Sequence, residues 1–230
     1  MLNLRQRPRR PTLLGLLAGL GSVGLVVASW QSWLMLPLDR TEVLAFVTGA
    51  WSVWLAARNN VWTWPIGVLN SAFFVVLFWD ARLFFDMGLN VFYVLSGLWG
   101  WWVWAFGAER RTPQPICSVG RREGGLVLMA VLGLSLGMWQ GGLFIDDAAP
   151  LLDALTTALS IGAQWLLMRR LLDNWYLWIA ADVIYIPLYA YKGLPLTAVL
   201  YVIFLLMCLR GLAEWRAILQ RRRSPLAVVA

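Results

Sequence analysis

Long apolar runs separated by short polar segments set the pattern of this chain. Most of these runs approach the roughly 20 residues that an α-helix needs to cross a lipid bilayer. The first run follows a basic tail but is too long for the core of a signal peptide, so we expect a retained helix. The pattern predicts eight membrane-spanning helices, at about residues 13–36, 42–57, 64–79, 83–106, 124–143, 149–168, 175–191 and 194–213.

The composition agrees with a polytopic membrane protein. Of the 230 residues, 60% are hydrophobic and only 13% are charged, which a soluble domain of this size would not tolerate. The net charge of +7 would suggest nucleic acid as a partner of a soluble protein. Here the positions of the charges give a better explanation, and we expect the lipid bilayer rather than nucleic acid as the partner.

The basic residues alternate from side to side as the eight spans require. If the N-terminal tail is cytoplasmic, sixteen of the nineteen basic residues fall on the cytoplasmic side. A wrong number of spans would scramble this bias, so both termini are predicted to be cytoplasmic. The three basic residues on the opposite side are Arg40, Arg82 and Lys192.

Matches between two parts of the chain predict an internal repeat. Gly49-Ala50-Trp51 resembles Gly162-Ala163-Gln164-Trp165, Asn70 with Phe73 resembles Asp182 with Tyr185, and Gly97 with Trp101 resembles Gly211 with Trp215, all at nearly the same spacing along the chain. Two three-helix copies can point the same way only if another helix carries the chain back between them. The predicted fold is all-α, a 3+1+3 parallel repeat of transmembrane helices plus one extra N-terminal helix.

This repeat divides the chain into five segments. The polar connection at 107–123, with two prolines and four arginines, is the predicted boundary between the halves. The segments are a basic tail and extra helix (1–41), a first repeat (42–106), a cytoplasmic loop and linker helix (107–148), a second repeat (149–216) and a basic C-terminal tail (217–230).

A carboxylate within the seventh span is the strongest functional signal. Asp182 lies seven residues after Trp175, roughly 10 Å along a helix and therefore inside hydrocarbon. An ionised group at that depth costs about 2.5 to 3.5 kcal/mol, so it is by default a functional group that faces protein or water. One arc of about 80° on the helical wheel contains Trp175, Trp178, Asp182, Tyr185 and Tyr189.

A face with one acid and four aromatic rings suits a flat organic cation, because aromatic faces and carboxylates both attract positive charge. Two structural alternatives stay open. The tryptophans can belong to an interfacial belt, and Asp182 can hydrogen-bond to a neighbouring helix. In repeat transporters the substrate lies between the halves near mid-membrane, which places Asn70 and Phe73 of the third span opposite Asp182.

Other functional classes have less support. The chain contains no histidine and two cysteines, Cys117 in a predicted loop and Cys208 within a span. An embedded enzyme needs a nucleophile with its base, paired acids or a metal cluster at one depth, and a channel needs rings of carbonyls or charges. We see neither pattern, and we expect no enzyme, cofactor or metal.

Further residues carry a resemblance to a known family. Asn174-Trp175-x-x-Trp178-x-x-x-Asp182 follows Ala163-Gln164 and precedes Tyr185, Lys192-Gly193-Leu194 and Tyr201. Earlier in the chain stand Trp64-Pro65-x-Gly67-x-x-Asn70 and the run from Tyr93 to Trp104. Over residues 42–216 this combination resembles the PnuC family of bacterial vitamin transporters.

The resemblance implies a fold similar to the SWEET sugar transporters, a homotrimer in the inner membrane, and facilitated uptake of an unphosphorylated vitamin that a cytoplasmic kinase then traps. By matching motif positions, the residues that line the site would be Trp64, Asn70, Gln164, Trp175, Trp178 and Asp182. Many members have Asn where this chain has Asp182, which leaves the vitamin open. Nicotinamide riboside and thiamine are planar cations that suit this site, in that order, and riboflavin is neutral.

Transport down a gradient is the favoured mechanism, with alternating exposure of Asp182 and Asn70 to the two sides. A coupled pump is expected to show a relay of acids or histidines at membrane depth. Asp182 is the one acid clearly at that depth. Proton coupling through it stays an open alternative.

Overall fold

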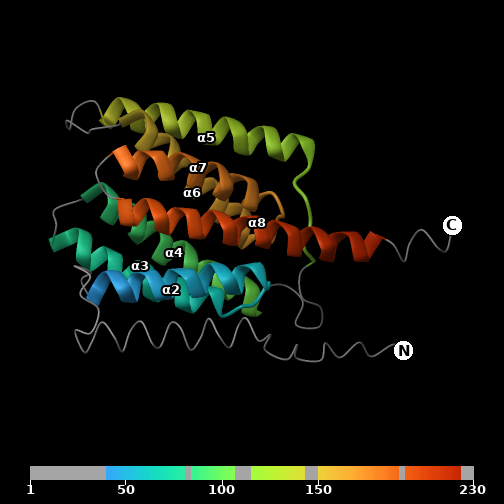
Figure 1. The fold of residues 1–230 in the computed structure, drawn as a ribbon. Coiled ribbons are helices and arrows are strands. Elements are labelled where there is room, and N and C mark those ends of the chain that lie inside the picture. Colours follow the sequence, from blue (N-terminus) through green and yellow to red (C-terminus); the bar gives the residue numbers. More distant parts are fainter. Residues whose placement is uncertain (1–39, 81–83, 107–114, 143–149, 192–194, 224–230) are drawn as a thin grey trace. The chain divides into compact units, whose positions relative to one another are not determined.

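The computed structural model describes residues 40–80, 84–106, 115–142, 150–191 and 195–223, whose fold is all-helical (Figure 1). The chain divides into two compact units, Met1–Val47 and Thr48–Ala230, and the second contains the packing and the candidate site. The predicted span at 13–36 lies outside the described residues. The helices are α2 (Arg40–Ala57), α3 (Thr63–Asp80), α4 (Phe84–Phe106), α5 (Arg121–Gly142), α6 (Pro150–Met168), α7 (Asn174–Tyr191) and α8 (Pro195–Arg223).

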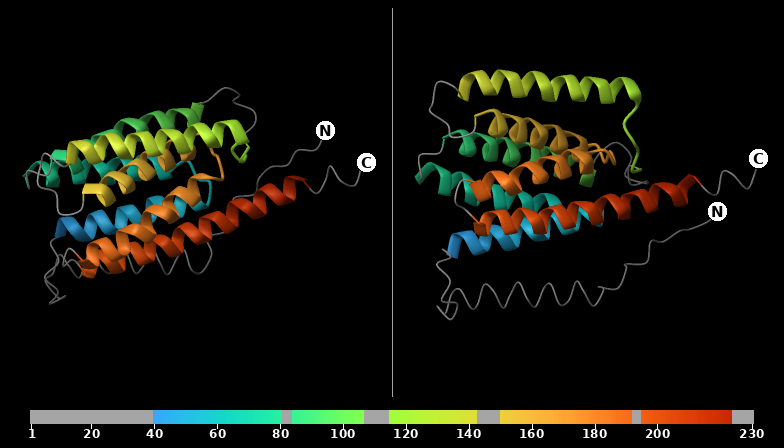
Figure 2. Two further views of the ribbon diagram at one scale, coloured as in Figure 1. Left: turned by 90° about the horizontal axis from the view of Figure 1, so that it is seen from above. Right: turned by 45° about the horizontal axis from the view of Figure 1, so that its top comes forward.

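Apolar run length predicted the helix bounds well, with one exception. The first six of these helices begin and end within three residues of the predicted spans. Helix α8 continues past the predicted end of the last span, near residue 213, to Arg223 and extends beyond its neighbours (Figure 2). Fully buried Trp215 anchors this extension, and Arg210 donates a hydrogen bond of 3.2 Å to Glu214 one turn away.

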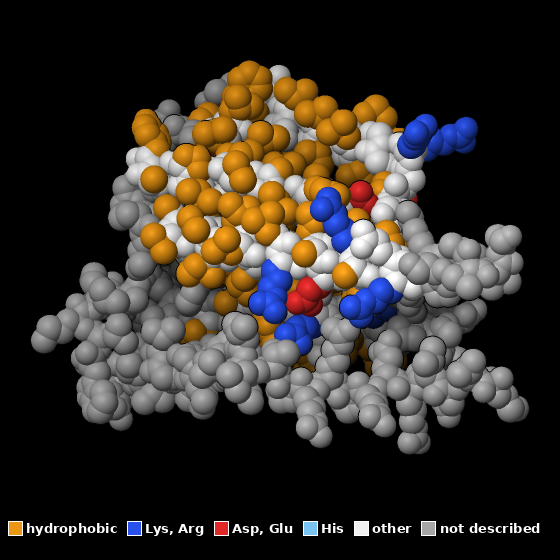
Figure 3. All heavy atoms as spheres, turned by 45° about the vertical axis from the view of Figure 1, so that its right-hand side comes forward, with side chains coloured by type: hydrophobic (Ala, Val, Ile, Leu, Met, Phe, Trp, Pro, Cys, Tyr) orange, Lys and Arg blue, Asp and Glu red, His pale blue; other side chains and the backbone are white. Residues whose placement is uncertain are grey.

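Hydrophobic side chains cover much of the described surface of the second unit (Figure 3). By length and hydropathy alone, α5 over Arg121–Gly141 and α6 over Pro150–Met168 qualify as membrane spans among the described residues. In addition, α3, α4, α7 and α8 all expose large apolar side chains. Apolar patches of this extent mark a surface that faces lipid or a partner rather than water.

Helix α7 occupies a central place in the packing of this unit. It packs on α6 and α8, while α6 also contacts α4 and α5, and α4 packs on α3. Buried Val131 lies on the side of α5 that meets α6, where its methyl group is 3.0 Å from a Cβ built at Gly162. Functional side chains on α7 therefore meet α6 and α8, and the ring of Trp178 also meets Tyr93 of α4.

The turn between α2 and α3 has a counterpart between α6 and α7. The Asn60 N–H donates to the Leu55 carbonyl at 2.9 Å, and the Leu171 N–H donates to the Leu166 carbonyl at 3.0 Å. Each turn contains a residue with positive φ, an uncommon conformation outside glycine. These residues are Asn59 (φ 51°) and Arg170 (φ 53°). The number of residues from Asn59 to Arg170 is called the repeat offset, and residues separated by this number are treated as counterparts.

The first tryptophan of α7 packs against α8 through a glycine. A Cβ at Gly211 would lie 2.6 Å from the Trp175 ring, so only glycine permits this approach. The Trp175 and Trp215 rings meet edge to face at 5.6 Å. The Trp215 indole in turn donates a hydrogen bond of 3.1 Å to the Ala57 carbonyl at the end of α2. Helices α7 and α8 are thereby tied to α2.

The first tryptophan of α3 packs on α4 in the same manner, one repeat offset earlier in the chain. A Cβ at Gly100 would lie 2.5 Å from the Trp64 ring, and the Trp64 and Trp104 rings meet at 5.3 Å. The Trp104 indole donates a hydrogen bond of 2.9 Å to the Met168 carbonyl at the end of α6. Trp104 thereby ties α4 to the end of α6, as Trp215 ties α8 to the end of α2.

The same end of the unit carries many of its charged groups. Arg58 forms a salt bridge with Glu214 at 3.8 Å, and Arg169 pairs with Glu123. The Arg170 guanidinium lies 4.2 Å from the centre of the Trp104 ring. Burial lowers the pKa of Arg170 to about 10, which leaves it charged at neutral pH. Several of the arginines predicted to be cytoplasmic thus form salt bridges or stack on an aromatic ring.

Candidate functional site

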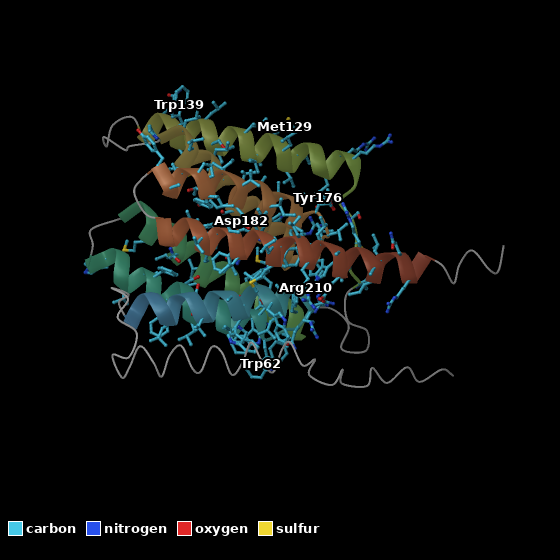
Figure 4. All side chains as sticks on the ribbon, in the orientation of Figure 1. Trp62, Met129, Trp139, Tyr176, Asp182 and Arg210 are labelled. Carbon is cyan, nitrogen blue, oxygen red and sulfur yellow. The ribbon has the colours of Figure 1, made fainter. Side chains whose placement is uncertain are left out.

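Asp182 is the one buried acid among the described residues, with 4% of its surface exposed. It lies midway along α7 and between the helices (Figure 4). Neither a salt bridge nor a hydrogen-bond donor to its Oδ2 atom is found in the described part of the chain. A carboxylate in such surroundings is costly unless a cation or a proton neutralises it. The position therefore suits a group that neutralises the carboxylate, either a bound cation or a proton.

The groups that act on Asp182 come from α4 and α8. The Cys208 thiol of α8 lies within hydrogen-bonding reach of the Asp182 carboxylate. The phenol of Tyr93, on α4, lies close enough to interact electrostatically with both Asp182 and Tyr185. All of these neighbours are uncharged when protonated, so none of them supplies a compensating positive charge.

Aromatic rings surround the acid on the same side of α7. Half-buried Trp178 and Tyr93 have ring centres 6.5 Å apart at an interplanar angle of 42°. The Tyr185 and Tyr201 rings lie 4.5 Å apart, and Tyr201 meets Phe204 edge to face at 5.9 Å. The predicted aromatic character of this face is present, and α4 and α8 contribute as much of it as α7 does.

Buried polar side chains extend the site onto α6 and α4. Gln164 donates a hydrogen bond of 3.2 Å to the Ser96 hydroxyl, which donates to the Tyr93 carbonyl at 3.3 Å. The Tyr93 phenol is hydrogen-bonded to Ser160 of α6. These groups provide hydroxyls and an amide beside the aromatic cluster, a combination suited to a ligand that carries polar substituents.

Asn70 of α3 lies at the far side of the same region. Its amide donates a hydrogen bond of 2.8 Å to the Thr48 hydroxyl of α2. A Cβ built at Gly49 would lie 3.6 Å from the Asn70 amide and 3.4 Å from the Phe204 ring, so the two side chains flank this glycine. From Phe204, ring contacts lead through Tyr201 to Tyr185.

Trp64 and Trp175, both predicted to line the site, lie in the apolar core with exposures of 3% and 1%. Their rings are engaged by the glycines and tryptophans described above. Each indole N–H nevertheless has no hydrogen-bond acceptor in the described ranges. The two side chains are thus placed to support the site, with their N–H groups as unused donors.

Phe73 does not join the buried cluster, because 39% of its side chain is exposed. The register of the repeat explains this placement. The repeat offset between the two turns makes Ser71 the counterpart of Asp182 and Phe74 the counterpart of Tyr185. Each of these lies one residue after the counterpart inferred from sequence, which was Asn70 or Phe73. One residue rotates a helix by about 100°, which carries Phe73 from the inner face to the outer one. Ser71, in contrast, is buried.

Several residues of the cluster were not predicted from sequence, namely Tyr93, Ser96, Ser160 and Cys208. A helical signal for two of them exists on α4, where Tyr93, Ser96, Gly100 and Trp104 follow one face at intervals of three and four residues. Ser160 and Gln164 share a face of α6 in the same way. Serine and cysteine are common in apolar helices, so composition alone does not single them out.

An open apolar depression of about 530 Å³ lies elsewhere on α7. Its lining residues are Leu152, Val183, Ile184, Pro187, Leu188 and Tyr191. The α7 members of this group occupy the side of the helix opposite Asp182. The depression is therefore a feature of the outer surface and separate from the candidate site.

Comparison with known proteins identifies relatives over most of the chain. The nicotinamide riboside transporter PnuC of Escherichia coli strain K12 is 24% identical, with 77% of this chain and 85% of the relative covered. The corresponding transporter of Neisseria mucosa is 28% identical, with 77% and 72% covered. The riboflavin/roseoflavin transporter RibM of Streptomyces davaonensis is 21% identical, with 76% and 84% covered.

A solved structure supports the same relationship at the level of the fold. The crystal structure of the vitamin B3 transporter PnuC superposes with a TM-score of 0.68 and 22% identity, and covers 89% of this chain and 92% of that chain. These relatives are transporters rather than enzymes, and bacterial membrane proteins. The profile of nicotinamide mononucleotide transporters matches residues 40–217, and the chain belongs to this family.

Proposed function

We propose that this protein takes up nicotinamide riboside across the bacterial inner membrane by facilitated diffusion. The observation that carries the proposal is Asp182, buried midway along α7 with one carboxylate oxygen unpartnered among the described residues. Nicotinamide riboside has a planar pyridinium ring whose charge matches the acid and whose face matches Trp178 and Tyr93. Its ribose and amide groups match the hydroxyls and amides of Ser96, Ser160 and Gln164.

The charge of the site favours the riboside over the mononucleotide for which the family is named. A phosphate group would bring negative charge close to Asp182, and like charges repel strongly in a medium of low dielectric constant. Anchoring a phosphate normally requires arginine, lysine or a helix N-terminus. Of the described arginines that have salt-bridge partners, Arg58 and Arg169 lie just past the ends of α2 and α6, and Arg210 lies midway along α8, where it is half-exposed and paired with Glu214.

Thiamine is the second candidate, because its thiazolium ring is also a planar cation. Riboflavin transport, the function named for the Streptomyces relative, fits less well because riboflavin is neutral and gains nothing from the acid. Binding to the purified protein, measured by calorimetry with each vitamin and with nicotinamide mononucleotide, tests the ranking. We expect nicotinamide riboside to bind most tightly. Tighter binding of the mononucleotide or of riboflavin would contradict the proposal.

Alternating access follows if α2–α4 and α6–α8 are the two repeats of a 3+1+3 SWEET-like fold with α5 as the linker. The equivalent turns and tryptophan contacts, separated by the same repeat offset, support that arrangement. The indoles of Trp104 and Trp215 bind the opposite repeat at the basic end. We propose that these two hydrogen bonds break when the site opens toward the cytoplasm. The family resemblance also supports a homotrimer and a cytoplasmic kinase that traps the vitamin.

Substitution of the two motif tryptophans should separate binding from folding. We expect Trp178→Ala to weaken nicotinamide riboside binding about tenfold with little change in stability, because the half-buried ring faces the site. Trp175→Ala should cost about 3 to 5 kcal/mol of stability, as for other buried tryptophans. Calorimetry and thermal unfolding in detergent measure the two effects. A larger loss of affinity in a folded Trp175→Ala protein would show that the rings have the opposite roles.

The proposed topology places exposed Cys117 in the cytoplasm, whereas Cys208 is buried. A membrane-impermeant maleimide should therefore label inside-out vesicles and leave intact cells unlabelled. Because the chain has two cysteines, Cys117→Ser is the matched control that should abolish the signal. Labelling of Cys117 from the periplasmic side would invert the topology.

A further inference from the structure

The Asp182 carboxylate is held by one side chain that sequence comparison did not point to. Cys208 lies on α8 between Tyr201 and Gly211, with 4% of its surface exposed. Because Tyr201 contacts Tyr185 and Gly211 contacts Trp175, Cys208 faces the part of α7 that carries Asp182, and its thiol is within hydrogen-bonding reach of the carboxylate. The second carboxylate oxygen, Oδ2, has no hydrogen-bond partner in the described part of the chain. The Cys208 thiol can thus bind one carboxylate oxygen, and Oδ2 is left for a bound ligand.

A thiol is well suited to this task. It is a weak donor that strengthens when the acceptor carries charge, and it is small enough to fit between closely packed helices. It adds no positive charge, so it orients the carboxylate without neutralising it. An arginine or lysine at the same place would instead form a salt bridge with Asp182 and remove the attraction for a cationic ligand.

The pair occurs in only one of the two equivalent halves. At the repeat offset, the counterparts of Asp182 and Cys208 are Ser71 and Gly97. A Cβ at Gly97 would lie 2.7 Å from the Val68 side chain, so a cysteine side chain does not fit at this position without a shift of Val68. The charged end of a ligand is therefore directed to α7 and α8, and its neutral end to the opposite side.

We propose that Cys208 is a positioning residue that sets the preference of the site for a cationic ring over a neutral ring of the same shape. Its thiol holds the Asp182 carboxylate so that Oδ2 faces the bound ring. This role rests on the proposed function, because it assumes that the ligand is a pyridinium or similar cation.

Two ligands that differ in charge but hardly in shape test the proposal, namely nicotinamide riboside and its reduced, uncharged dihydropyridine form. In Cys208→Ala we expect about tenfold weaker binding of the cation by calorimetry and little change for the reduced form, because a charge-assisted hydrogen bond is lost. Cys208→Ser keeps a donor and should restore most of the preference. Equal losses for both ligands, or a serine variant that behaves like alanine, would overturn the proposal.

A second measurement needs no ligand. In a Cys117→Ala background, the infrared S–H stretching band reports Cys208 alone. We expect Asp182→Leu to shift this band to higher frequency, because the thiol loses its acceptor. A band that does not move would overturn the inference. If the band shifts as expected but the unsubstituted protein binds neither form of the riboside, the proposed function is refuted and the hydrogen bond between Asp182 and Cys208 still stands.

Discussion

Asp182→Leu is expected to weaken the binding of nicotinamide riboside strongly while the protein stays folded. The substitution removes the only buried acid among the described residues, and with it the proposed counter-charge for the pyridinium ring. An interaction with a charged partner in a buried site contributes about 1.5 to 3 kcal/mol, and about 1.4 kcal/mol corresponds to a factor of ten. The loss of affinity should therefore be on the order of 100-fold, as measured by calorimetry on the purified protein.

The matched variant Asp182→Asn separates charge from shape. The amide retains the size of the side chain and can accept a hydrogen bond from Cys208, but it has no charge. We expect it to bind the cationic and the reduced riboside with similar affinities. Asp182→Leu should also raise the melting temperature of the ligand-free protein, because a buried carboxylate costs about 2.5 to 3.5 kcal/mol at this depth. Affinity that does not change in either variant would remove Asp182 from the site.

Gly211→Ala should strongly destabilise the fold. The added Cβ would lie 2.6 to 2.8 Å from three atoms of the Trp175 ring, which is itself fully buried against Trp215. Overpacking of this kind costs about 1 to 3 kcal/mol or more, since neither the ring nor the backbone has space to move. Gly100→Ala should have a similar effect through Trp64, where the corresponding distances are 2.5 to 2.7 Å. Thermal unfolding in detergent measures both.

Gly137→Ala on α5 is the control for these variants. A Cβ there meets nothing within 4 Å, so the substitution should leave stability unchanged or raise it by about 0.5 to 1 kcal/mol through a better helix propensity. If Gly211→Ala were as stable as Gly137→Ala, the close contact between α7 and α8 would not be a determinant of the fold.

The register of the repeat shows where sequence reasoning was limited. Similar residues matched at spacings slightly longer than the repeat offset, which the turns and the tryptophan contacts share. An error of one residue is small along the chain but rotates a helix by about 100°. For this reason the counterpart of Asp182 is Ser71 rather than Asn70. The glycine and tryptophan were matched three residues too early, because the contacts show that Gly100 with Trp104 corresponds to Gly211 with Trp215. Similarity between residues does not define which face of a helix they occupy, whereas equivalent hydrogen bonds in the two turns fix the register of the helices that follow.

The order of residues was enough to predict the helices and the depth of the acid, since both depend on the local run of apolar residues and on the rise of a helix. It also indicated the aromatic face around Trp178 and Tyr185. Only the packed helices show that Trp64 and Trp175 turn to the core and that Tyr93 and Cys208 surround Asp182. These placements could not be predicted because contacts between helices depend on close approach at a few small residues, such as Gly100 and Gly211, and on the rotation that this approach imposes.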